Sequence, residues 1–135
     1  ELDVHQPELL LNLASTYMRQ GRFKSALRTL DTAAREAPAS SEPWQQMGLC
    51  HYRLGDFDGA LDAYRKAVSL NSSDAGAHRG LGIIYMSQYV RDGGDTDLKD
   101  KALSAWHTSL EIQPKQSDLR QLVKKYSEEA KAPNL

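Results

Sequence analysis

Residues 44–67 read WQQMGLCHYRLGDFDGALDAYRKA, and the spacing of small, aromatic and turn residues in this stretch recurs along the chain. Leu13, Met47 and Leu81 follow one another at intervals of 34 residues, and Gly21 precedes Gly55 by the same interval. A fixed period of this length indicates a supersecondary unit that cannot bury its apolar face alone. Neighbouring units must stack to form a continuous core, so the sequence predicts an all-α helical repeat.

The repeated residues resemble the tetratricopeptide repeat, a helix-turn-helix unit with the pattern W-x2-L-G-x2-Y…A-x3-F…P. The second copy carries Trp44, Met47, Gly48 and His51, followed by Ala60. The resemblance implies a right-handed α-solenoid of three such repeats in a single domain, closed by a capping helix. The expected boundaries are 7–40, 41–74 and 75–116, the last with an eight-residue insertion, and 117–131 for the capping helix.

The local chemistry of the repeat predicts the same arrangement. Small residues at Ala14, Gly48 and Gly82 allow two helices to approach closely, while aromatic side chains fill wider gaps. Gly21 and Gly55 stand where a helix must end in a left-handed conformation, and Asp56 is placed to cap the helix that follows.

The insertion in the third copy centres on residues 92–97, which read DGGDTD. The preceding helix is expected to continue through Val90. The aspartates do not have the spacing of a calcium-binding loop, because Lys99 stands at a ligand position and no glutamate follows in register. We expect a solvated loop in which Thr96 or Asp97 caps the next helix.

Composition narrows the possible functions. The 135 residues are 40% hydrophobic and 26% charged, with a net charge of −1. This balance gives no general attraction to nucleic acid or acidic lipid, and no basic stripe favours RNA binding. No apolar run reaches the ~20 residues that a membrane-spanning helix needs. A cytoplasmic location is expected, and a secreted or periplasmic one stays open because the chain begins with Glu1 rather than with Met.

No catalytic or metal-binding constellation is found. Cys50 is the single cysteine and is expected to be buried, and adjacent helical residues such as His51 do not face one another. The four histidines lack zinc-site spacing, and phosphate-binding loops and nucleophile elbows are absent. We therefore expect a protein that is not an enzyme and has neither cofactor nor metal.

Function is then expected on the surface. The resemblance implies that the first helix of each repeat lines a concave groove, which suits a peptide or helix with apolar anchors and some acidic character. The expected groove residues are Leu11, Asn12, Ser15, Arg19, Gln45, Gln46, Leu49, Tyr52, Arg53, Arg79, Ile83 and Met86.

One variant of the family can be compared position by position. Repeats that clamp the terminal carboxylate of chaperones carry lysine, asparagine or arginine at five groove positions. This chain has other residues there, which disfavours that role: Leu11, Ser15, Gln46, Gly76 and Gly80.

The first helix carries an excess of leucine. Leu9 and Leu10 put leucine on more than one of its faces, beside Leu13. We expect an upstream repeat or a second copy of the chain to cover them. The leading hypothesis is thus a non-catalytic protein-interaction scaffold, and the alternative is a self-assembly module that uses this helix.

Overall fold

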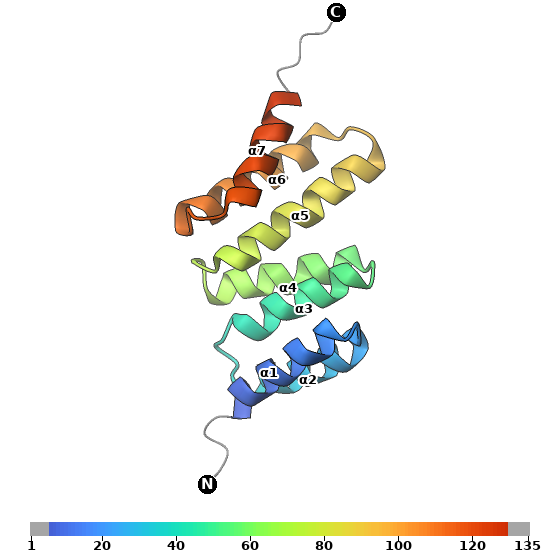
Figure 1. Ribbon diagram of the computed structural model, residues 1–135, viewed down its shortest axis with the longest axis vertical. Helices are drawn as coiled ribbons and strands as arrows, with labels where there is room; N and C mark the ends of the chain where they lie inside the picture. The colour runs from blue at the N-terminus through green and yellow to red at the C-terminus, as the bar shows by residue number, and fades with distance from the viewer. Residues whose placement is uncertain (1–5, 130–135) are drawn as a thin grey trace, which may run out of the picture. The chain divides into compact units, whose positions relative to one another are not determined.

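The computed structural model describes residues 6–129, and these residues form helices without any strand (Figure 1). The helices are α1 (Gln6–Arg19), α2 (Phe23–Glu36), α3 (Glu42–Arg53), α4 (Phe57–Leu70), α5 (Ala75–Asp92), α6 (Thr96–Ile112) and α7 (Ser117–Glu129). They divide into two compact units, one ending at Ser72 and the other beginning at Ser73. The predicted all-α repeat architecture is confirmed. Residues 130 and 131 of the expected capping helix lie outside the described part of the chain.

The first unit contains two helical hairpins, α1 with α2 and α3 with α4. Each hairpin turns at a glycine in the left-handed region, Gly21 with φ 74° and Gly55 with φ 80°, as predicted. Side chains with a Cβ rarely adopt this conformation. Asp56 begins α4 by accepting a hydrogen bond from the Gly59 amide at 2.9 Å, which confirms the expected cap.

The two hairpins of the first unit share one core. Ala14 on α1, Leu30 on α2 and Cys50 on α3 are fully buried members of the same apolar cluster, which Ala63 on α4 completes. Gly48 lets α3 approach α4, because a Cβ at this position would lie 2.7 Å from the Tyr64 ring. The close approach expected from the repeat pattern is therefore present.

The second unit packs α5, α6 and α7 together. The helix α5 continues past Val90 to Asp92, as expected, and then Gly93 turns the chain with φ 78°. The cap of α6 differs from the expectation: Asp95, not Thr96 or Asp97, accepts the hydrogen bond from the Asp97 amide. The helix begins one residue earlier in the loop because a carboxylate at the N-cap reaches the amide two residues on.

Trp106 is the largest buried side chain among the described residues of the second unit. Its indole lies against Gly82, where a Cβ would overlap the ring, so the glycine is required by the aromatic partner on α6. Leu119 on α7 is fully buried in the same cluster. In residues 6–129 no helix is both long and apolar enough to cross a membrane.

Candidate functional site

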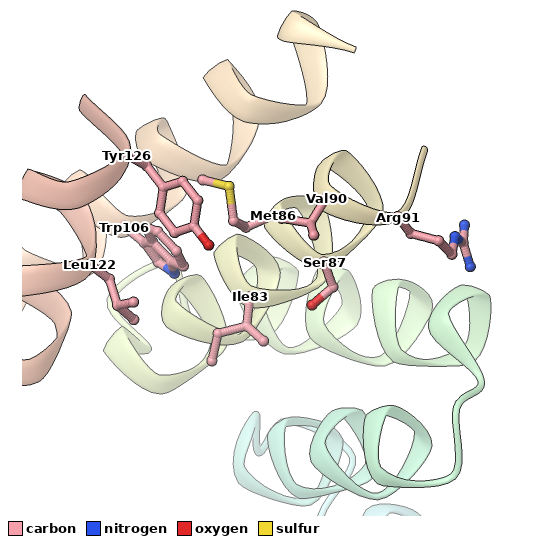
Figure 2. Close-up of a pocket in the computed structure, with 8 residues that line it drawn as sticks. All are labelled: Ile83, Met86, Ser87, Val90, Arg91, Trp106, Leu122 and Tyr126. Carbon is pink, nitrogen blue, oxygen red and sulfur yellow. The ribbon is translucent and has the colours of Figure 1, made fainter. Parts of the chain in front are cut away.

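An apolar pocket of about 390 Å³ opens in the second unit (Figure 2). Three helices line it with aliphatic, aromatic and sulfur-containing side chains and little polar surface. The lining residues are Ile83, Met86, Ser87, Val90 and Arg91 from α5, Trp106 from α6, and Leu122 and Tyr126 from α7.

Helical periodicity explains this lining. Ile83, Ser87 and Val90 recur on one face of α5 at intervals of four and three residues, and Leu122 and Tyr126 do so on α7. Figure 2 shows the α7 side chains across from those of α5, with the Arg91 side chain pointing away from the others. Val90 is 61% exposed, so its methyl groups are available to a ligand at the mouth of the pocket.

The side of the pocket formed by α7 is fixed by an ion pair. The Arg79 guanidinium on α5 donates through Nη2 to Asp118 Oδ2 at 2.5 Å and through Nη1 to Asp118 Oδ1 at 3.2 Å. Nη1 also donates to Gln116 Oε1 at 3.0 Å. A bidentate arginine–carboxylate pair fixes the relative orientation of the two side chains as well as their distance. It therefore sets the start of α7 against α5.

A partly buried hydrogen-bond network continues from this ion pair. Ser109 is fully buried on α6, and its hydroxyl donates to the Ala75 carbonyl oxygen at 2.8 Å while accepting from Gln116 Nε2 at 3.0 Å. The Trp106 indole N–H donates to the Arg79 carbonyl oxygen at 3.2 Å. Ser109 stands at the repeat position that Ala33 and Ala67 occupy in the first two copies. The serine has a structural role here, since it connects α5, α6 and the segment leading into α7.

The ion pair also shifts the acidity of its members. The hydrogen bonds from Arg79, and next from the Leu119 amide, lower the pKa of the Asp118 carboxyl below its usual value. The hydrogen bond to Asp118 raises the pKa of Arg79. Both shifts favour the charged forms, so the pair remains ionised at neutral pH.

The groove residues predicted on α5 therefore have different environments. Ile83 and Met86 line the pocket, although Met86 is only 4% exposed and lies at its base. Arg79 was expected among the groove residues, and in the structure it pairs with Asp118 and Gln116. The reason is long-range: its partners are 37 and 39 residues away in the sequence.

Sequence reasoning did not assign Val90, Leu122 or Tyr126 to a site. Val90 was expected only within an extended helix, and the other two lie in the expected capping helix, 117–131. The sequence did contain a signal for Val90. The extended helix α5 carries this apolar residue one turn beyond Met86, so the apolar face that lines the pocket continues past Met86. That α7 contributes to the same pocket is visible only in the fold.

The remaining predicted groove residues all lie in the first unit, on two helices. The α1 set is Leu11, Asn12, Ser15 and Arg19, and the α3 set is Gln45, Gln46, Leu49, Tyr52 and Arg53. Leu49 is 40% exposed. Arg53 places its guanidinium carbon 5.0 Å from the centre of the Phe23 ring on α2, an arrangement that holds the cation at the surface.

Gln46 has an unusual environment for an amide. Its Oε1 atom is buried and has no hydrogen-bond partner in the described chain. A buried acceptor without a donor is unfavourable by roughly 1–3 kcal/mol.

The Cys50 and His51 side chains do not form a catalytic pair. Cys50 is fully buried, and this burial raises its pKa to about 11, which keeps the thiol protonated. His51 instead directs Nδ1 toward the Asp56 carboxylate at 3.1 Å. Within residues 6–129 no cluster of three potential metal ligands occurs.

Comparison with known proteins decides the family. The family model of the tetratricopeptide repeat matches residues 11–75 and 46–88. The chain belongs to the tetratricopeptide repeat family. This confirms the resemblance drawn from the 34-residue period.

Two relatives of this tetratricopeptide repeat protein are described as heat-shock or co-chaperone proteins. The heat shock protein STI1 of Saccharomyces cerevisiae is 30% identical over 83 residues, which cover 62% of this chain and 14% of that protein. The heat-shock protein cognate co-chaperone sgt12 of Aspergillus fumigatus is 30% identical over 77 residues, covering 56% and 23%. The aligned parts thus make up less than a quarter of either relative.

Solved tetratricopeptide structures are also similar. The first such domain of Spaghetti (RPAP3), bound to the HSP90 peptide SRMEEVD, has a TM-score of 0.81 at 18% identity and covers 96% of this chain and 97% of that one. MamA has a TM-score of 0.76 at 26% identity, covering 95% and 70%. At 18% identity the RPAP3 likeness establishes the fold alone.

Proposed function

We propose that this chain is a non-catalytic adaptor that binds a peptide or helix of a partner protein. The observation that carries the proposal is the open apolar pocket of the second unit, where an exposed Val90 stands beside buried Met86 and Trp106. Such pockets accept the apolar anchors of a peptide. The co-chaperone relatives and the peptide-bound RPAP3 domain support a role in protein–protein interaction.

The first unit supports the choice of ligand. Exposed Leu49 offers apolar contact, and Arg53 offers a cation. Because arginine pairs well with carboxylates, the ligand is a peptide with apolar anchors and some acidic character. In the second unit, Arg79 is not proposed as a ligand-binding cation, since it already pairs with Asp118.

The ligand's terminal carboxylate is not the recognised group. The five positions that would clamp it carry Leu11, Ser15, Gln46, Gly76 and Gly80, none of which is charged. The heptapeptide SRMEEVD tests this point directly. With a free or an amidated C-terminus, it should bind this chain with the same affinity. A strong loss on amidation would contradict the absence of a clamp.

The pocket is tested with matched substitutions at two exposed aliphatic residues. Fluorescently labelled acidic peptides with two apolar anchors are titrated into the whole chain, and binding is followed by anisotropy. Val90→Glu places a carboxylate at the pocket mouth and should weaken binding about tenfold or more. Ile112→Glu makes the same change at a site that is 37% exposed and outside the pocket, and should leave affinity unchanged. Equal affinities for parent and Val90→Glu would refute the assignment of the pocket.

A further inference from the structure

The outer face of α1 resembles a buried face of α3 that is missing its cover. Leu9, Leu13 and Thr16 precede Pro43, Met47 and Cys50 by 34 residues each. Leu9 is 62% exposed and Leu13 is 44% exposed, whereas Met47 is 7% exposed and Cys50 is fully buried. The same repeat positions are therefore covered on α3 and open on α1.

The structure shows what covers these positions on α3. The helix α2 packs against α3, and Met47 and Cys50 share a core cluster with Leu30 and Ala34 of α2. The alanines of α2 allow close approach, and its leucine fills the space between them. The α2–α3 interface is thus an internal template for the missing contact.

The open face is compatible with burial. The Thr16 hydroxyl already donates to the Asn12 carbonyl oxygen at 3.1 Å, so only its methyl group needs a partner. Leu9 and Leu13 lie one turn apart on the same side of α1. Covering the face would therefore desolvate apolar groups without leaving an unpaired polar atom on these three residues.

We propose that this face binds the second helix of another helical hairpin, with the alanine–leucine stripe of α2. This occupant is argued from the α2–α3 interface rather than from the proposed peptide binding, and it uses a different surface. The stripe has alanine, leucine and two further alanines at the spacing of Ala26, Leu30, Ala33 and Ala34.

A second copy of the chain fits the face less well. Its last helix, α7, directs its apolar residues Leu119, Leu122 and Tyr126 into its own unit. The α7 residues that the structure describes as exposed are all polar: Ser117, Asp118, Arg120, Gln121, Lys124, Lys125 and Glu128. Pairing α1 with α1 would rest mainly on two exposed leucines a side, well short of the ~1,000 Å² that a stable interface needs.

The experiment adds the proposed occupant. A tandem variant repeats residues 7–40 directly before Pro7, which preserves the 34-residue period. The added second helix should dock on the resident α1, raise Tm by at least about 4 °C and slow amide hydrogen exchange in α1. Leu9→Lys with Leu13→Lys in the resident α1 should abolish that rise. The same pair of changes without the added hairpin should leave Tm nearly unchanged, because both leucines are exposed.

Leu54→Lys is the matched control, since Leu54 is 43% exposed at the end of α3 and is not one of these positions. The tandem variant that carries Leu54→Lys should still show the rise in Tm. A rise that survives the double lysine change would overturn the proposal. So would an added hairpin that contributes no helical ellipticity to a folded chain. A dimer of the parent chain in sedimentation, lost with the two lysines, would assign the face to a second copy instead.

Discussion

Gly82 on α5 lies directly against the indole of Trp106 on α6, and there is no space for a Cβ between them. Trp106 is 2% exposed and also donates its N–H to the Arg79 carbonyl oxygen, so the ring is held on two sides. The absence of one methyl group on α5 thus permits the largest buried side chain of this unit. This relationship makes Gly82 a sensitive test of the packing.

Gly82→Ala should destabilise the protein, although alanine is the better helix former by about 1 kcal/mol. The added methyl group must displace a buried ring, and overpacking of this kind costs about 1–3 kcal/mol. Urea unfolding followed by circular dichroism measures the change. Ser104→Ala, at an exposed site on α6, should be neutral or slightly stabilising. A stabilising effect of Gly82→Ala would contradict the close contact.

In the first unit, Gly48→Leu should likewise lower the free energy of unfolding by at least about 1–3 kcal/mol, because the leucine side chain would clash with the Tyr64 ring.

Arg79→Glu should lower the free energy of unfolding by about 1–2 kcal/mol. The change removes the bonds to Asp118 and Gln116 and sets two carboxylates against each other. The estimate is modest because Asp118 is largely exposed.

Arg120→Glu supplies the control for charge reversal near the start of α7. Arg120 is exposed and should change stability by less than about 0.5 kcal/mol. Thermal and urea unfolding of both variants are compared with the parent. If the two reversals had equal effects, the ion pair would not be what positions α7.

Acidification should weaken the contribution of Asp118. Its pKa in the folded protein lies below the unfolded value of about 3.9, so its contribution is present above that value and is lost as pH falls through the folded pKa. The difference in free energy of unfolding between the parent and Asp118→Asn should therefore be largest near neutral pH and shrink in acid. Denaturation series at several pH values measure it. A difference that stays constant with pH would exclude the ionised pair as its source.

Cys50 should react with thiol reagents only when the first unit opens. Its thiol is fully buried, and desolvation raises its pKa to about 11. The folded state favours the neutral thiol. The contribution of Cys50 to the free energy of unfolding is therefore fully present below the unfolded pKa of about 8.5, and it is lost as pH rises toward the pKa of the folded protein. Labelling with a chromogenic disulfide at pH ~8 should be slow and accelerate with urea. A Ser104→Cys variant in a Cys50→Ala background should label rapidly, and comparable rates would contradict the burial.

The sequence by itself determined the repeat and most of its local structure. The 34-residue period gave the helical hairpins, and Gly21, Gly55 and Asp56 marked turns and a cap that depend only on neighbouring backbone. Small residues at Gly48 and Gly82 marked close helix contacts. These features are local or recur with the period, so a single chain displays them.

Only the tertiary structure decided how the candidate site is composed. It assigned the α6 cap to Asp95, gave the pattern-breaking Ser109 a bonded role, and turned Arg79 from a ligand-binding candidate into the partner of Asp118. It also brought Val90 of α5 and Tyr126 of α7 into one pocket. Helical periodicity specifies the face on which a side chain lies. Which distant residue meets that face depends on how the helices pack, and the α5 and α7 residues that meet here are more than 30 positions apart in the chain.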